Sequence, residues 1–202
     1  MALPAHKISY SFAEYLTLET ETKLRYEYYW GEVYAMAGSS KAHNRLVNNT
    51  WTALQANKKK DCEAYTENIK VEIVSQEIYT YPDVAFTCDA QDLQDDYFIR
   101  NPLLLVEVKS RSTEDFDKGE KFILYQKLPS LVYYLLISQK QVLVECYTKQ
   151  VGNTWLYQAY QSISEEIFLE KIGITLKLKD IYDSISVKAS PVFTQIFPTE
   201  KK

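Results

Sequence analysis

The stretch LLLVEVKSRSTED, residues 103–115, brings two opposite charges to the end of an apolar run. Four apolar residues lead into Glu107, and Lys109 follows after a single valine. A run this apolar is typical of a strand inside a sheet, where an unpaired charge costs several kcal/mol. Because side chains alternate across a strand, Glu107 and Lys109 share one face, with Val106 and Val108 on the other. Both charges therefore need a cation, one another, or water at the end of the strand.

The composition is that of one globular domain. The chain has 202 residues, of which 46% are hydrophobic and 25% charged, enough for one sizeable core but too few for two. We expect a single domain over residues 1–187 and a loose tail over residues 188–202. The formal net charge of −4 argues against a protein that coats nucleic acid through bulk positive charge. It allows an enzyme that meets phosphates through a bound cation.

Seventeen tyrosines are an unusual number for this length. Tyrosine favours strands, and its ring offers a stacking and hydrogen-bonding surface for a nucleic acid or for another protein chain. The alternative for each tyrosine is a place in a sheet or at its rim.

The cysteines and histidines exclude several kinds of site. Cys62, Cys88 and Cys146 are far apart and odd in number, so they indicate neither a disulfide framework nor a zinc ribbon. His6 and His43 are too few for a histidine-rich metal site. The N-terminus lacks a basic region followed by an apolar core, and no apolar stretch reaches the roughly 18 residues that span a membrane. We therefore expect a cytoplasmic protein.

Hydrophobic periodicity and helix caps predict an α/β chain, with a mixed sheet of the α+β kind and helices packed on its faces. An acidic loop over residues 89–96 is expected to be solvated. The expected helices span residues 11–16, 41–58 and from Ser112 or Thr113 to Leu128; the expected strands span 63–74, 78–87, 103–109, 131–137, 141–147 and 155–160; a hairpin over 26–37 turns at Gly31, and residues 173–178 with 181–182 form a terminal docking segment.

A second carboxylate lies on the preceding expected strand, in Tyr81-Pro82-Asp83. Pro82 marks a strand start or edge, because proline has no N–H to donate to a ladder. If the two strands are neighbours, Asp83 and Glu107 converge at one end of the sheet. Two hard carboxylates with few other protein ligands suit Mg²⁺ or Mn²⁺, which complete their shells with water and phosphate oxygens. A bound cation would explain why an apolar strand tolerates charge.

Pro82-Asp83, upstream of Glu107-Val108-Lys109 on an apolar strand, resembles the PD-(D/E)xK signature of restriction-endonuclease-like nucleases. From Ser9 to Asp183 the chain is similar to the Uma-two family of bacterial endonucleases. The resemblance implies a restriction-endonuclease-like core of helix, three strands, helix and strand, with an N-terminal hairpin and C-terminal strand additions. It rests on PLLLVEVKSRSTEDFDKGEKFILYQKLPSLVYYLLIS, on YEYYWGEVYAMAGSSKAHNRL and on YPDVAF.

The resemblance implies a metal-dependent phosphodiesterase site. Asp83 and Glu107 would bind the cation, together with the backbone carbonyl of Val108. Lys109 would orient or activate the attacking water and neutralise charge on the scissile phosphate. A divalent ion lowers the pKa of a bound water and stabilises the charged transition state. The alternative for Glu107 and Lys109 is an ion pair at a sheet edge.

Three further residues are candidates for the same site. Many sequences of the family use a lysine on the following helix, and Lys121 stands there in this chain. We expect Lys109 to be the catalytic lysine and Lys121 to face phosphate, the alternative for Lys121 being ion pairs on the helix surface. Glu27 opens the hairpin where the family carries a glutamate, and it can complete the metal shell. His43 lies in the first turn of a helix, where it can hydrogen-bond a phosphate or the carboxylates, or else cap or pack.

The predicted function is a Mg²⁺- or Mn²⁺-dependent endonuclease acting on DNA, and these residues do not separate DNA from RNA. The alternative from another class is a catalytically silent nuclease fold that binds nucleic acid or a protein partner. Asp83, Glu107 and Lys109 favour the enzyme, whereas the negative net charge and the lack of a DNA-reading module favour the silent fold. A homodimer would supply two sites for cutting both strands, and tyrosine-rich edges could form its interface.

Overall fold

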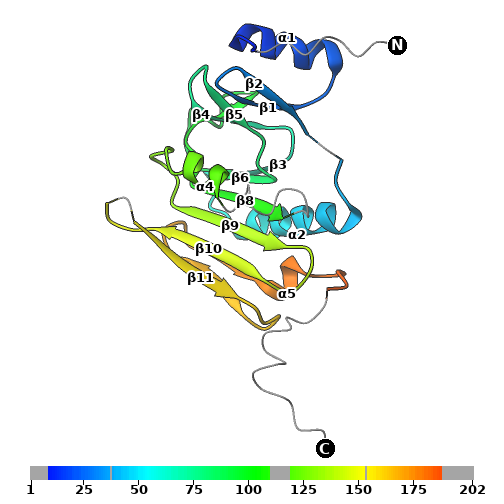
Figure 1. Cartoon of the computed structure of the whole chain (residues 1–202). Coiled ribbons are helices and arrows are strands. Elements are labelled where there is room, and N and C mark those ends of the chain that lie inside the picture. Colours follow the sequence, from blue (N-terminus) through cyan, green and yellow to red (C-terminus); the bar gives the residue numbers. More distant parts are fainter. Residues whose placement is uncertain (1–8, 37, 110–118, 153, 188–202) are drawn as a thin grey trace, which may run out of the picture.

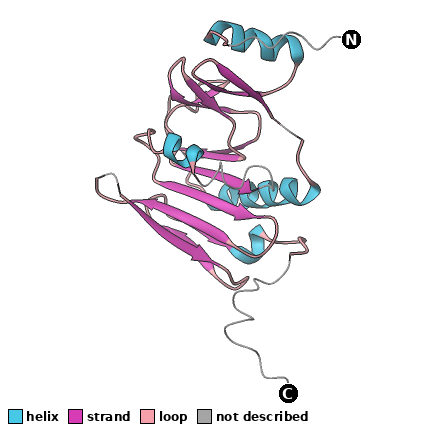
Figure 2. Ribbon diagram, viewed as in Figure 1, coloured by secondary structure: helices cyan, strands magenta, loops and turns pink. Residues whose placement is uncertain are grey.

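The fold consists of two large sheets and one separate pair of strands, with helices packed against them (Figure 1, Figure 2). The structure, a computed structural model, describes residues 9–36, 38–109, 119–152 and 154–187. The described helices are α1 (Phe12–Thr22), α2 (Lys41–Asn57), α4 (Glu120–Tyr125) and α5 (Leu178–Ile181). The six-stranded sheet has the order β11 (Trp155–Tyr160), β10 (Val144–Lys149), β9 (Tyr133–Ser138), β8 (Leu104–Lys109), β6 (Val84–Thr87) and β3 (Glu63–Thr66). The five-stranded sheet has the order β2 (Glu32–Ala35), β1 (Tyr26–Tyr29), β5 (Ile78–Thr80), β4 (Lys70–Val74) and β7 (Phe98–Ile99), and the separate pair is β12 (Glu166–Leu169) with β13 (Ile174–Lys177).

The apolar run around Glu107 forms an interior strand of the six-stranded sheet. β8 lies between β6, to which it is antiparallel, and β9, to which it is parallel. All six residues of β8 are buried. Val106 and Val108 pack in one core, while Leu105 packs in a second core on the opposite face. The predicted alternation is therefore confirmed, and it puts Glu107 and Lys109 on the Leu105 face.

Different elements cover the two faces of this sheet. On the Val106 face, α2 packs through Leu46 and Leu54, together with the β12–β13 pair and α5. On the opposite face, α4 packs through Leu124 and Tyr125. α1 lies at the far end of the molecule, against the β1–β2 hairpin (Figure 1). A mixed sheet with helices on its faces is what the sequence predicted.

Two of the expected strands are each divided between the two large sheets, so the prediction of single strands was wrong. Residues 63–74 form β3 in one sheet and β4 in the other, and Asn68 between them has a φ of 66°. Residues 78–87 form β5 and β6 in the same way, divided around Pro82. Asparagine tolerates a left-handed backbone and proline cannot donate to a ladder, so both breaks have a local cause. The hydrophobic alternation continues across each break and hides it.

The loop over residues 89–96 is not solvated throughout, contrary to expectation. Asp92 is buried. Its carboxylate accepts hydrogen bonds from the Thr87 hydroxyl at 2.8 Å and from the backbone N–H groups of Arg100 and Asn101 at 2.8 and 3.0 Å. A buried carboxylate is tolerated when donors satisfy it in this way. Asp92 thereby holds together the connection that leads into β8.

Cys62 and Cys88 form a disulfide, which corrects the prediction that the cysteines form none. Cys62 directly precedes β3 and Cys88 directly follows β6. The antiparallel register pairs Glu63 with Thr87, so the next pair outward is that of the two cysteines, whose Cα atoms are 4.0 Å apart. Sequence spacing cannot show this pairing, because it depends on which strands become neighbours. Cys146 is free and buried.

The C-terminal part of the described chain docks against the six-stranded sheet, as predicted. β13 and α5 pack beside α2, and the Tyr182 hydroxyl accepts a hydrogen bond from the Leu143 N–H at 3.1 Å and donates to the Ser138 carbonyl at 3.0 Å. The tail expected over residues 188–202 lies outside the described residues, as does the start of the helix expected from Ser112 or Thr113. Within the described ranges, no helix is both long and apolar enough to cross a membrane.

Candidate functional site

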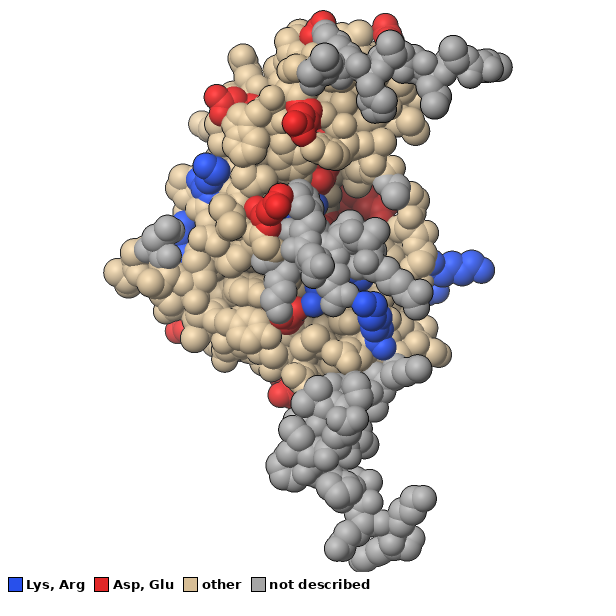
Figure 3. Space-filling model, in the orientation of Figure 1, with Lys and Arg blue, Asp and Glu red and all other residues tan. Residues whose placement is uncertain are grey.

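A cleft of about 1890 Å³ is lined by both large sheets, by the first turn of α2 and by α4. In the space-filling view, acidic side chains are recessed between the upper and lower parts of the molecule (Figure 3). The seven residues proposed from the sequence all line this cleft: Glu27, His43, Asp83, Glu107, Val108, Lys109 and Lys121. Residues that are far apart in the sequence therefore meet in one place.

Asp83 stands directly before β6, beside the charged end of β8. Its Oδ2 accepts a hydrogen bond from the Val108 N–H at 2.6 Å and lies 3.1 Å from His43 Nε2. The antiparallel pair of Val84 with Val106 explains the first contact, because Asp83 then lies next to the residues that follow Val106. The expectation that these two strands are neighbours is confirmed. The N–H and C=O of one strand residue point to the same edge, so the Val108 carbonyl also faces this side.

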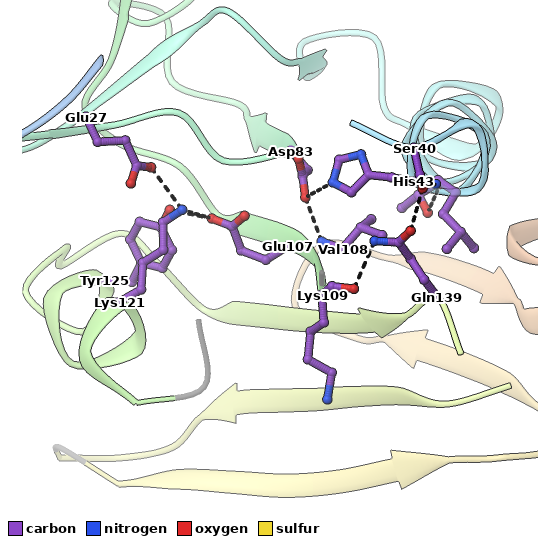
Figure 4. Close-up of polar contacts among 12 residues, drawn as sticks. Glu27, Ser40, His43, Asp83, Glu107, Val108, Lys109, Lys121, Tyr125 and Gln139 are labelled. Atoms are coloured by element: carbon purple, nitrogen blue, oxygen red, sulfur yellow. Dashed lines mark hydrogen bonds and ion pairs between the residues drawn. The ribbon is translucent and has the colours of Figure 1, made fainter. Parts of the chain in front are cut away.

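His43 reaches Asp83 from the first turn of α2. The Ser40 hydroxyl caps this helix by accepting a hydrogen bond from the His43 N–H at 3.1 Å. Ser40 also donates to Gln139 Oε1 at 2.7 Å, and Gln139 Nε2 donates to the Lys109 carbonyl at 3.0 Å (Figure 4). The start of α2 is thereby tied to the ends of β8 and β9. Sequence analysis missed Gln139, which belongs to no motif.

Glu67 joins Asp83 and His43 in a group that can hold a cation. One ligand atom from each residue lies within 4.8 Å of those of the other two. Glu67 lies in the turn between β3 and β4, and its N–H donates to the Asp83 carbonyl at 3.3 Å. Two carboxylates this close repel each other, and a cation held between them would offset that repulsion. Carboxylate oxygens are the ligands that Mg²⁺ and Mn²⁺ prefer, so the group fits either ion.

A second group surrounds Lys121 on α4. Its Nζ lies 2.9 Å from Oε1 of Glu107 and 2.9 Å from Oε1 of Glu27 (Figure 4). One helical turn later, the Tyr125 hydroxyl donates to Glu107 Oε1 at 2.7 Å. Burial alone would lower the pKa of Lys121, but the carboxylates of Glu107 and Glu27 outweigh burial and raise that pKa well above its usual value. Lys121 is therefore a fixed cation at the wall of the cleft.

Lys109 points away from this group, although it shares a sheet face with Glu107 (Figure 4). Its Nζ forms an ion pair with Glu145 on β10. The Tyr157 hydroxyl donates to the other oxygen of Glu145, Oε1, at 3.1 Å. Both Lys109 and Glu145 are buried. In the described ion pairs, Lys121 is therefore the partner of Glu107, and Lys109 is the partner of Glu145.

Among the described residues that line the cleft, acidic side chains outnumber basic ones. Six of the described lining residues carry carboxylates and five are lysine or arginine: Glu27, Glu32, Glu67, Asp83, Glu107 and Glu120 against Lys23, Arg25, Lys109, Lys121 and Lys140. Since the described side chains give the cleft a slight excess of negative charge, a bound cation would favour the entry of a polyanion. The cleft thus combines an acidic group around Asp83, which could hold a metal ion, with a buried cation at Lys121.

Comparisons with known proteins find relatives of nearly the whole chain. The model of the Uma2 family, described as "Putative restriction endonuclease", matches residues 12–178. Two Synechocystis proteins are similar: "Uncharacterized protein slr1290" is 38% identical over 175 residues, covering 86% of this chain and 91% of its own length, and "Uncharacterized protein sll1609" is 34% identical over 158 residues, covering 77% and 89%. The crystal structure of a "putative nuclease belonging to DUF820" from Anabaena variabilis has a TM-score of 0.69 and 15% identity, and the match covers 86% of this chain and 97% of that one. The family match and the structural likeness together confirm the predicted restriction-endonuclease-like fold.

Proposed function

Because the chain belongs to the Uma2 family, we propose that it is a metal-dependent endonuclease that hydrolyses phosphodiester bonds in DNA. One observation carries the proposal: the group around Asp83 and the buried cation Lys121 lie in the same cleft. Phosphodiester hydrolysis needs an activated water and positive charge opposite the oxygens that become more negative in the transition state. The family description and the nuclease fold of the structural relative support the same class of reaction.

The metal that we propose is Mg²⁺ or Mn²⁺, held by Asp83. Glu107 and the Val108 carbonyl are its expected partners, and Glu67 offers a further carboxylate beside Asp83. His43 contacts Asp83 through Nε2, and an outer partner of this kind fixes the orientation of a ligand carboxylate. When bound, the cation would lower the pKa of a coordinated water and offset charge on the phosphate.

Lys121 takes the role in this proposal that the sequence analysis gave to Lys109. The Lys121 ammonium contacts Glu107 and Glu27 and lines the cleft, whereas the Lys109 ammonium is held by a carboxylate on β10. From its position the Lys121 Nζ can donate a hydrogen bond to a non-bridging phosphate oxygen or to the attacking water. Tyr125 holds Glu107, and Glu27 holds Lys121, so the charges are arranged before a substrate arrives.

Nicking of supercoiled plasmid tests the proposal. The wild-type protein should nick plasmid with Mn²⁺ or Mg²⁺ but not with EDTA, and Asp83→Ala and Lys121→Met should each lose about 100-fold or more of the rate. Lys149→Met is the matched control and should keep the wild-type rate, because Lys149 contacts backbone carbonyls outside the cleft. Equal nicking by all four proteins would reveal a contaminating nuclease and overturn the proposal.

The same variants decide the finer points. Lys109→Met beside Lys121→Met shows which lysine serves the reaction, and labelled RNA beside plasmid shows which nucleic acid is cut. If neither is cut, although Mn²⁺ raises the unfolding temperature of the wild type and not of Asp83→Ala, the protein is a silent nuclease fold. Light scattering after size exclusion measures the oligomeric state, and a homodimer would supply two sites for cutting both strands.

A further inference from the structure

The β1–β2 hairpin has one covered face and one open face. Tyr28 and Val33 are directly opposite each other in the register, and they pack with α1. Glu27 and Tyr34 form the neighbouring pair, and both line the cleft on the other side. Glu27 contacts Lys121 there, so Tyr34 lies beside the group that we propose for the phosphate.

Large apolar side chains stay exposed on this side of the hairpin. Trp30 at the hairpin tip is 58% exposed and Tyr34 is 54% exposed, and Leu24 and Met36 are exposed as well. All four residues line the cleft, and we call them the aromatic wall. Exposed apolar side chains that gather at one cleft, next to converging polar groups, indicate a binding surface rather than a core.

Trp30 also occupies a backbone position that tryptophan disfavours. Trp30 and Gly31 are the two turn residues of the hairpin, with φ angles of 47° and 95°. Two-residue turns with two positive φ angles favour asparagine, aspartate or glycine at the first position, because a bulky side chain is strained there. The exposed indole gains little burial to compensate for this strain. A strained backbone that presents an exposed ring to a cleft points to a role in binding.

We propose that the aromatic wall stacks on an unpaired base of the substrate, so that the site takes single-stranded or locally unpaired nucleic acid. This inference rests on the proposed function. In a duplex the base faces are covered by neighbouring pairs and only the edges are accessible, whereas an unpaired base offers its face to an aromatic ring. Because Tyr34 is paired with Glu27, a base on Tyr34 would lie next to a phosphate at Lys121.

The surroundings of the wall favour a nucleic acid over a second copy of the chain. Lys23 and Arg25 lead into β1, are exposed, and line the same cleft, where they can follow backbone phosphates. The cores of protein–protein interfaces are depleted of charge. Leu24 of the aromatic wall is instead flanked in the chain by Lys23 and Arg25, and Tyr34 is paired with Glu27, which contacts Lys121. Binding sites for single strands combine stacking rings with positive charge in this way.

Fluorescence anisotropy in EDTA, where no strand is cut, measures this preference with labelled oligothymidylate and with a duplex of equal length. The single strand should bind about tenfold more tightly, and Trp30→Asn and Tyr34→Ala should each weaken single-strand binding about tenfold while leaving duplex binding unchanged. Asparagine suits the turn, so Trp30→Asn should fold at least as stably as the wild type. Tyr97→Ala is the matched control, since Tyr97 is 71% exposed and lies outside the cleft lining.

A second readout comes from tryptophan fluorescence. Trp51 and Trp155 are partly buried, so quenching by the oligonucleotide should come mainly from Trp30 and disappear in Trp30→Asn. Equal affinity for single strand and duplex, or the same affinity in Tyr34→Ala and Tyr97→Ala, would overturn the inference. So would a wild-type dimer that Trp30→Asn makes monomeric, because the wall would then bind a second copy. Selective single-strand binding without plasmid nicking would instead contradict the proposed nuclease activity but support the proposed stacking surface.

Discussion

Replacing Lys121 by methionine should destabilise the folded chain by roughly 3–5 kcal/mol, because the substitution leaves buried carboxylates without their cation. The side chains of Lys121 and Glu107 are 7% and 6% exposed, so little water can take the place of the ammonium. Methionine keeps the unbranched apolar stem of lysine, and the loss therefore reports on charge rather than on packing. Glu27 is more accessible, which places the expected value near the lower end of this range.

Urea and thermal unfolding measure this loss. In a domain of this size each kcal/mol lowers the melting temperature by about 2–4 °C, so Lys121→Met should melt roughly 6–12 °C below the wild type. Adding Glu107→Gln to Lys121→Met should recover at least about 1 kcal/mol, because a neutral amide no longer needs a cation. Lys149→Met should stay within about 0.5 kcal/mol of the wild type. The reasoning fails if Lys121→Met is as stable as Lys149→Met, or if Glu107→Gln adds to the loss instead of reducing it.

Elsewhere in the molecule, reduction of the Cys62–Cys88 bond should lower the free energy of unfolding by about 3.5 kcal/mol, since the bond joins residues separated by 26 positions. Urea unfolding with and without dithiothreitol measures the difference, which Cys62→Ser should abolish. Burial raises the pKa of Tyr182 to about 12, so the folded chain keeps a proton that an unfolded tyrosine releases near pH 10. The free energy of unfolding should therefore fall as the pH rises from about 10 to about 12, and less steeply in Tyr182→Phe. Glu19 lies 2.6 Å from Lys70 Nζ and both are buried, so Glu19→Gln should cost roughly 3 kcal/mol. Its Mn²⁺ affinity in calorimetry should stay that of the wild type, because neither residue lines the cleft.

The sequence predicted that Glu107 and Asp83 lie near each other on neighbouring strands, because these positions depend on short-range patterns. Alternation along β8 assigned Glu107 to one sheet face, and the buried cores on the two faces agree with it. Pro82 indicated a strand start or edge beside Asp83, although residues 78–87 were predicted as one strand, and the β6–β8 pairing brings Asp83 to Val108. These steps need only the period of a strand and the missing N–H of proline.

Such patterns could not predict the ion-pair partners of Lys109 and Lys121. Alternation fixes the face on which a side chain leaves a strand, but it does not fix the direction of a long flexible chain across that face. Lys109 turns toward Glu145, which is 36 residues away in the sequence. The two residues come close only because β8 and β10 are both neighbours of β9 in the sheet. Lys121 was assigned to surface ion pairs or to phosphate, and its contact with Glu27 depends on a strand of the other sheet.

Glu67 and Gln139 were missed for a related reason. Glu67 reaches the site because the chain turns at Asn68, inside a stretch whose alternation suggested one unbroken strand. Gln139 connects Ser40 with the end of β8 across 99 residues of sequence. Both positions follow from how the two sheets join, and a hydrophobic period carries no information about that junction.

The partners of each lysine also decide which of them can serve a phosphate. Lys121 is held by Glu27 and Glu107 at the wall of the cleft, so an entering phosphate oxygen would replace one anionic partner by another and leave the ammonium paired throughout. Lys109 would first have to leave Glu145, which is almost fully buried, and that carboxylate would then remain without its cation inside the sheet face. When the phosphate oxygen displaces Glu27, whose side chain is 14% exposed, Glu107 keeps its cation, so we expect this exchange at Lys121 to cost less than exchange at Lys109. A lysine two residues after the glutamate is thus no guide by itself to the lysine that meets the substrate, because the neighbouring strands of the sheet can supply a buried partner for it.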